Sequence, residues 1–157
     1  MFAALAMSCR APTDVQSPAA GQRNTDLIHK DDIMTGHRAV SIAPGGAYAS
    51  AYEVSDARRT VYISGQVPER PDGSLPEGFE AQCRQVWANL DAVLAGAGMT
   101  RRDLVRVTTY LSDRRDRDVN ARVRREVLGD HLPALTIIIA GIYDPAWLLE
   151  IEAVAAR

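Results

Sequence analysis

The chain lacks many of the residue types and patterns on which common enzyme chemistries depend. It has two cysteines, Cys9 and Cys83, which by themselves cannot build a disulfide framework or a tetrahedral zinc site. Its three histidines are isolated and do not have the paired spacing of a metal site. The motifs GxxxxGK[ST], HExxH, GxSxG and CxxC are all absent. The most familiar phosphate-binding, metal and nucleophile motifs are therefore excluded.

Long apolar runs and an excess of one charge are also missing. No stretch of eighteen apolar residues occurs, so we expect no membrane span. The 18 basic and 20 acidic residues leave a net charge of -2, which gives no global reason to expect a nucleic-acid partner. With 157 residues, 46% of them hydrophobic and 24% charged, the composition is that of one globular domain.

Residues 1–33 differ from the rest of the chain in composition. A short apolar run ends at Cys9, and the segment 6–9 loosely resembles a bacterial lipobox, although a basic region and a full apolar region are missing. We interpret 1–33 as a disordered or tether-like extension, or as translation from an upstream start, before a domain at 34–157. We expect a cytoplasmic protein; the alternative is an exported lipoprotein anchored at Cys9.

From residue 34 onward, alternating and helical hydrophobic periods predict an α+β domain with two helices on one face of a mixed sheet. The predicted strands are 39–42, 47–54, 60–64, 104–111, 136–142 and 147–155, and the predicted helices are 79–97 and 116–128. Eight residues from Phe79 to Ala97, including Cys83, Trp87 and Val93, recur at helical spacing and predict one buried stripe. A buried thiol is therefore expected at Cys83, rather than a nucleophile.

One predicted strand bears on assembly. Residues 136–140 read Thr-Ile-Ile-Ile-Ala, without the polar alternation of a half-exposed strand, so both faces should be covered. Two helices can cover only one face of such a sheet. The strand therefore predicts a homo-oligomer, in which a partner subunit covers the other face.

A cluster of charge lies between Arg101 and Arg125, with nine arginines and four aspartates. Such a cluster binds RNA phosphates in some proteins and is a solvated surface in others. No aromatic residue lies between Arg114 and Arg125 to stack on bases, which favours the solvated surface. The isolated histidines are likewise expected in loops or at the surface.

Five short segments resemble the YjgF/RidA family. They are Pro-Gly-Gly-Ala-Tyr at 44–48, Ile-Ser-Gly-Gln at 63–66, Val-Asn at 119–120, Pro-Ala at 133–134 and Leu-Glu-Ile-Glu-Ala at 149–153. They fall in family order and cover the whole predicted domain, and the Pro-Ala and Glu-Ile-Glu-Ala segments are the most specific. The resemblance implies a chorismate-mutase-like subunit. It also implies a homotrimer with a central barrel and a small-molecule ligand cleft at each subunit interface.

The resemblance also implies a chemistry and a set of site residues. RidA members hydrolyse reactive 2-imino or enamine acids to 2-keto acids and ammonia, without metal or cofactor. On the matching positions of this chain, Tyr48 lines the cleft, and Gly65 and Asn120 lie near the bound acid. Glu150 positions or activates the attacking water, as a general acid or base does.

Two positions depart from the family pattern. Leu135 stands where the family has the arginine that binds the substrate carboxylate, and Ile137 stands where it has a cysteine. Loss of a charge-assisted hydrogen bond of ~1.5–3 kcal/mol corresponds to roughly 10- to 100-fold in affinity. We therefore expect a substrate other than 2-iminopropanoate and 2-iminobutanoate, with no carboxylate or with one held elsewhere.

Each matched residue also has a purely structural interpretation, so several functions remain open. Glu150 belongs on a solvated sheet face, Tyr48 is an ordinary strand aromatic, and Asn120 fits the polar side of a helix. The candidates are an imine or enamine hydrolase, a non-catalytic trimeric protein that binds a small molecule or a protein, and, third, an endoribonuclease. An unpaired Glu150 in an open cleft favours the first, and a cleft filled by Leu135 or Ile137 favours the second.

Overall fold

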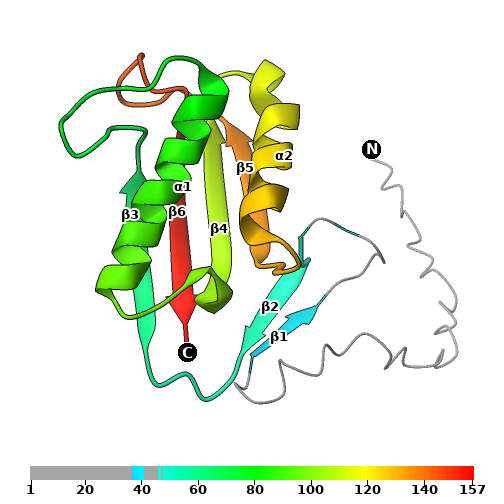
Figure 1. The fold of residues 1–157 in the computed structure, drawn as a ribbon. Helices are drawn as coiled ribbons and strands as arrows, with labels where there is room; N and C mark the ends of the chain where they lie inside the picture. Colours follow the sequence, from blue (N-terminus) through cyan, green and yellow to red (C-terminus); the bar gives the residue numbers. More distant parts are fainter. Residues whose placement is uncertain (1–36, 41–45, 47) are drawn as a thin grey trace, which may run out of the picture.

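The computed structural model describes residues 37–40, 46 and 48–157 (Figure 1). In chain order the elements are β1 (His37–Val40), β2 (Ala51–Val54), β3 (Thr60–Gln66), α1 (Phe79–Gly96), η2 (Arg101–Asp103), β4 (Leu104–Leu111), η3 (Arg114–Asp116), α2 (Arg117–Leu128), β5 (Ala134–Ile139) and β6 (Leu149–Ala156). None of the helices in this part of the chain is long and apolar enough to cross a membrane. The interpretations of 1–33 and of Cys9 lie outside the described residues.

The main sheet has four strands in the order β3-β6-β4-β5. Strand β6 is antiparallel to both β3 and β4, whereas β4 and β5 run parallel. Both helices lie on one face of this sheet, α1 over β3 and β6 and α2 over β4 and β5 (Figure 1). The predicted α+β fold is thereby confirmed. Strands β1 and β2 form a separate antiparallel pair.

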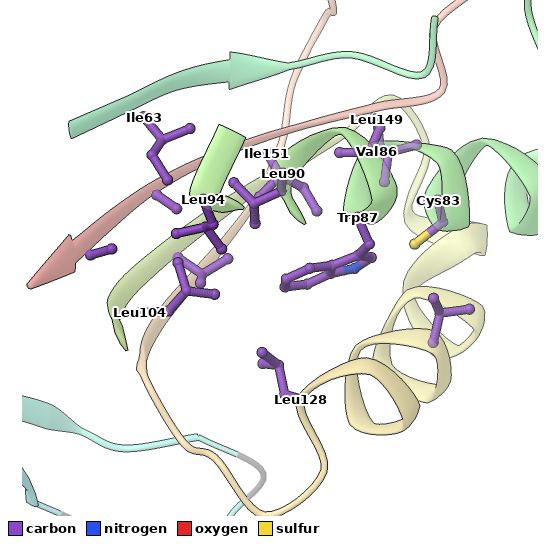
Figure 2. Close-up of a cluster of buried hydrophobic side chains, with 14 of the residues drawn as sticks. Ile63, Cys83, Val86, Trp87, Leu90, Leu94, Leu104, Leu128, Leu149 and Ile151 are labelled. Carbon is purple, nitrogen blue, oxygen red and sulfur yellow. The ribbon is translucent and has the colours of Figure 1, made fainter. Parts of the chain in front are cut away.

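The core lies between the helices and the sheet. The apolar stripe of α1 packs against alternate residues of β4 and β6, with Trp87, Leu90 and Leu94 completely buried (Figure 2). The thiol of Cys83 is buried beside them, which confirms its predicted structural role. Val93 departs from the predicted stripe, because its side chain is 37% exposed on the outer side of the helix.

Strand boundaries differ from the predicted ones where pairing rather than composition sets them. Strand β5 begins at Ala134, two residues early, because its parallel register with β4 starts at the pair Arg106 and Ala134. It ends at Ile139, where β4 also ends. The last strand begins at Leu149 rather than at residue 147, because the Trp147 amide closes a turn on the Asp144 carbonyl at 3.0 Å.

The sheet face opposite the helices stays open in the single chain. Tyr62 is 81% exposed there, and Ile138 on β5 is 43% exposed. A hollow of about 290 Å³ lies on the same face between β3, β4 and β6, with Arg106 and Glu152 among its lining side chains. That a second copy of the chain covers this face stays a prediction.

Candidate functional site

Gly65 and Glu150 form the closest approach among the expected site residues. Gly65 lies in β3 where the register with β6 shifts between Ile63 and Gln66, the mark of a β-bulge. A Cβ atom at position 65 would lie 1.6 Å from the Glu150 Oε1 and 2.6 Å from its Cδ. Only glycine therefore leaves room for the carboxylate where it lies, against the backbone of β3.

The Glu150 side chain is half-buried on the open face of the sheet. Tyr110 of β4 is its direct neighbour across the ladder. No hydrogen bond or ion pair to the Glu150 carboxylate occurs within the described residues. Its strand neighbour Glu152, two residues along on the same face, has Arg106 Nη2 at 3.8 Å. Glu150 is therefore a carboxylate available to water or a ligand.

Asn120 is a residue of α2 and lies on the helix side of the sheet, opposite Glu150. Its side chain is 1% exposed. The Oδ1 accepts a weak hydrogen bond from the Cys83 Sγ at 3.9 Å, and the Nδ2 has no hydrogen-bond partner. Burial raises the pKa of the Cys83 thiol to about 12, so this sulfur is a protonated donor at neutral pH. Asn120 thus offers an unused N–H donor to the interior.

Leu135 and Ile137 are half-buried on the helix side of β5. Both pack against the core, and across the ladder they pair with Val107 and Thr109 of β4, whose side chains are buried. The Thr109 Oγ1 also lacks a hydrogen-bond partner. Leu135 and Ile137, the two positions that depart from the family pattern, therefore form an apolar wall beside the unpartnered Thr109 hydroxyl, rather than a surface facing water.

Tyr48 lies next to the start of β5. The adjacent Ala49 forms a parallel bridge with Ala134, and its amide donates to the Pro133 carbonyl at 3.3 Å. The Tyr48 side chain is 49% exposed. This arrangement places Tyr48 near the Pro-Ala segment, and its role in lining a ligand cleft stays a prediction.

The expected site residues fall into two groups on opposite faces of the sheet. Glu150 alternates with the buried residues of β6 and lies on the open face with Gly65. Asn120, Leu135 and Ile137 lie on the helix side. A single copy of the chain therefore does not bring the proposed acid–base group next to the helix-side residues.

The arginine cluster is mostly a surface of ion pairs. Arg102 pairs with Asp130 at 2.6 Å, Arg122 with Glu80 at 2.7 Å, and Arg101 with Asp91. Arg124 is different, because it is only 4% exposed and no ion pair joins it to an acidic side chain in the described part of the chain. Its place in a charged run gave no sign of this. The helical spacing from Asn120, one turn earlier on the same face, was the available signal.

His131 also departs from expectation. It lies in the loop after α2, but its ring is buried, and Nε2 lies 2.7 Å from the Leu104 carbonyl oxygen. Its edge also contacts the Tyr52 ring, with 6.1 Å between centroids. Within the described part of the chain, no three His, Cys, Asp or Glu side chains are grouped to hold a metal ion.

The chain is thus an α+β protein in which a carboxylate on the last strand lies against a glycine of a neighbouring strand. The family model described as Endoribonuclease L-PSP matches residues 38–157. The chain belongs to this family, the YjgF/RidA family.

Three similar proteins illustrate the range of the family. A RutC family protein of Pyrococcus horikoshii is 34% identical over 73% of this chain and 90% of its own length. The 2-iminobutanoate/2-iminopropanoate deaminase of Rattus norvegicus is 29% identical over 71% of this chain and 81% of its own. The crystal structure of RidA from Psychrobacter sp. superposes with a TM-score of 0.60 and 33% identity, covering 73% of this chain and 92% of that one.

Proposed function

We propose that this protein hydrolyses a reactive imine or enamine metabolite to a carbonyl compound and ammonia. The observation that carries the proposal is the unpaired Glu150 carboxylate, held on the open sheet face against the backbone of Gly65. A carboxylate in this position can take a proton from water at the moment that the water oxygen attacks. The similarity to 2-iminobutanoate/2-iminopropanoate deaminases supports the same chemistry.

The reaction needs one water and no other reactant. The water oxygen bonds to the imine carbon while Glu150 accepts a proton and the C=N electron pair moves to nitrogen. Glu150 returns this proton to the nitrogen, then accepts the hydroxyl proton of the tetrahedral adduct and passes it to the same nitrogen, so that the C–N bond breaks, a carbonyl forms and ammonia leaves. Glu150 ends in its starting state, so a single carboxylate is sufficient for both proton transfers.

We further propose that the complete site forms between two copies of the chain. Glu150 and Gly65 lie on the open face, whereas Asn120, Leu135 and Ile137 lie on the helix side of the edge strand β5. When the open face of one copy packs against another, the carboxylate of the first copy faces the edge strand of the second. A homotrimer with three such interfaces satisfies this requirement with closed symmetry.

The substrate is expected to differ from the smallest 2-imino acids. Leu135 and Ile137 present an apolar wall in place of a guanidinium and a thiol, and both pack on the core. An apolar wall favours a substrate with an apolar side chain, because each buried CH₂ group contributes about 0.8 kcal/mol.

The test compares imine decay with and without the Glu150 carboxylate. A panel of amino acids is oxidised by an amino-acid oxidase, and semicarbazide traps the imine that remains. We expect wild type to accelerate decay of imines with apolar side chains and Glu150→Gln to lose the acceleration, because an amide cannot accept the proton. Glu152→Gln, which removes a carboxylate from the same strand face, is the matched control and should keep it. Absence of acceleration by wild type across the panel would overturn the proposal.

A non-catalytic binding role is the second candidate function. The observation that favours it is the packing of Leu135 and Ile137 against the core, which makes the helix side of β5 a more closed surface than an arginine would leave. In that case ketones and keto acids raise the unfolding temperature of the wild type, while no imine decays faster in its presence.

A further inference from the structure

Arg124 on α2 is a buried cation without a counter-charge. Its side chain is 4% exposed, and the Nε and Nη1 atoms have no hydrogen-bond partner. Burial lowers the pKa of the guanidinium, and the neighbouring Arg125 lowers it further. No ion pair joins Arg124 to any acidic group within the described residues. Arginine nevertheless stays protonated in proteins, so the charge persists inside the fold.

Most of the buried side-chain atoms without a hydrogen-bond partner in the described residues are N–H donors, with the Thr109 Oγ1 as the exception. Asn120 lies one turn earlier on the same face of α2, and its Nδ2 is buried without a partner. Within the described residues, the Asn120 amide oxygen accepts only the weak hydrogen bond from Cys83. In the same layer between the helices and the sheet, the Trp87 Nε1 donor also lacks a partner.

An unpaired guanidinium between the helices and the sheet destabilises the folded state. An isolated buried charge destabilises the folded state strongly unless an opposite charge and hydrogen bonds offset the loss of hydration. A buried water molecule can accept from the Asn120 or Trp87 N–H groups, but it does not neutralise a charge. The arrangement is therefore suited to an anionic acceptor with two oxygens that can face the planar guanidinium.

We propose that Arg124 and Asn120 form a carboxylate-binding site between α2 and the edge strand β5, and that this site takes 2-keto or 2-imino acids with apolar side chains. The guanidinium binds the carboxylate and the Asn120 Nδ2 donates a further hydrogen bond. Leu135 and Ile137, half-buried on the helix-facing side of β5, then contact the apolar side chain. This proposal rests on the proposed function in one respect. The carboxylate is taken to belong to the imine substrate or to its keto-acid product.

The position of the charge sets the specificity. In this chain the cation comes from α2 and the strand supplies only apolar contacts, so carboxylate and side chain are recognised by different elements. A branched, five- or six-carbon keto acid fills both parts, whereas pyruvate reaches only the cation. We expect 4-methyl-2-oxopentanoate to bind at least tenfold more tightly than pyruvate.

The experiment titrates the full chain with 4-methyl-2-oxopentanoate by calorimetry, with the uncharged 4-methyl-2-pentanone as the neutral probe. Arg124→Met is expected to weaken keto-acid binding at least tenfold and to leave binding of the ketone unchanged. Arg125→Met removes the same charge from the adjacent, exposed position and is expected to change the affinity less than twofold. Without ligand, Arg124→Met should unfold at the same or a higher temperature than wild type, because it removes an uncompensated buried charge.

Several outcomes overturn the proposal. One is a wild type that does not bind the keto acid, and another is an Arg124→Met protein that binds it as tightly as wild type. A variant with unchanged affinity but a lower unfolding temperature and a lost oligomer would show that Arg124 pairs with a carboxylate of a second copy. Arg124→Gln provides a second neutral variant if the methionine does not fold.

The result is separable from the test of imine hydrolysis. Arg124-dependent keto-acid binding without any imine hydrolysis by wild type leaves this site standing and removes the proposed function. Glu150-dependent hydrolysis with the same kcat/KM in Arg124→Met leaves the proposed function standing and removes this site.

Discussion

At the scale of single residues, the close approach of Gly65 and Glu150 is the feature that most constrains the chain. The bulge in β3 brings the backbone at position 65 against the carboxylate, and a side chain of any size would occupy the same space. The carboxylate is the end of a flexible side chain, so it can turn away without unfolding the sheet. The glycine therefore fixes where the carboxylate lies more than whether the protein folds.

We predict that Gly65→Ala lowers imine hydrolysis by about 100-fold, because a shift of roughly 1 Å in a catalytic group has an effect of that size. The unfolding temperature should fall only slightly. Gly96→Ala is the matched control, since a Cβ atom at that position meets nothing within 4 Å. Decay of the semicarbazide-trapped imine measures the rates; equal rates for Gly65→Ala and wild type would contradict the role of this glycine.

Sequence reasoning identified some of these residues and missed others for physical reasons. Glu150 and Gly65 were identified through their short motifs, and the structure places them together. Arg124 was assigned to a solvated surface, because a run of arginines and aspartates is usually exposed. Burial depends on the face of α2 on which each residue lies, and only the i, i+4 relation to the buried Asn120 separates Arg124 from its neighbours.

At the scale of elements, the two helices are joined on their outer side by four charged residues. Arg84 contacts Glu80 at 2.8 Å and Glu126 at 2.7 Å, and Arg122 contacts the same two carboxylates at 2.7 Å and 3.3 Å. Hydrogen bonds from Arg122 and Arg84 lower the pKa of Glu80 to about 2, and the same arginines lower the pKa of Glu126. Because the side chains are half-exposed, salt screens this network.

The sign of the pH dependence follows from these lowered pKa values. A carboxyl group whose pKa is lower in the folded than in the unfolded protein stabilises the fold at pH values above its unfolded pKa, near 4.5. This contribution disappears as the pH drops toward the folded pKa of about 2. We predict that Glu80→Gln lowers the unfolding temperature at pH 7 and that the difference from wild type shrinks between pH 4.5 and 2. Glu77→Gln, at an exposed position, should show no such pH-dependent difference. A difference for Glu80→Gln that persists at pH 2 would contradict this.

The buried stripe of α1 provides a direct test of the core. Trp87 is completely buried against β4 and β6, so Trp87→Ala should lower the free energy of unfolding by ~3–5 kcal/mol. Val93→Ala, on the exposed side of the same helix, is the control and should change it by about 0.5 kcal/mol or less. Urea denaturation measures both, and similar midpoints for the two variants would mean that the stripe does not carry the core.

The elements themselves were largely predictable, whereas their ends were not. The order of strands and helices follows from the spacing of hydrophobic residues, which changes between segments and can be read from each segment by itself. The start of β5 at Ala134 depends on a parallel partner in β4 distant in sequence, so no local pattern contains it. The exposure of Val93 was likewise not predictable, because its apolar side chain has the spacing of the buried stripe but lies at the edge of that stripe.

At the scale of the whole molecule, the open face of the sheet is the surface on which we expect assembly to occur. We predict a trimer at micromolar concentration, with a light-scattering mass about three times the 17.1 kDa of one chain. Ile138→Asp places a charge on the uncovered side of β5 and should dissociate it, whereas Ala88→Asp, at an exposed position on α1, should not. A wild-type monomer under these conditions would remove the interface site.

The division of the site residues between two faces of the sheet has a genetic consequence. If each site takes its carboxylate from one copy and its helix-side residues from the next, two defective alleles can complement each other. A chain carrying Glu150→Gln lacks the proposed proton acceptor, and a chain carrying Arg124→Met lacks the proposed carboxylate-binding cation, so we expect each to be impaired as a homo-oligomer. Mixed at equal amounts, they form about one interface in four that is intact on both sides. A cell that expresses both variants would regain a fraction of the activity that neither provides alone.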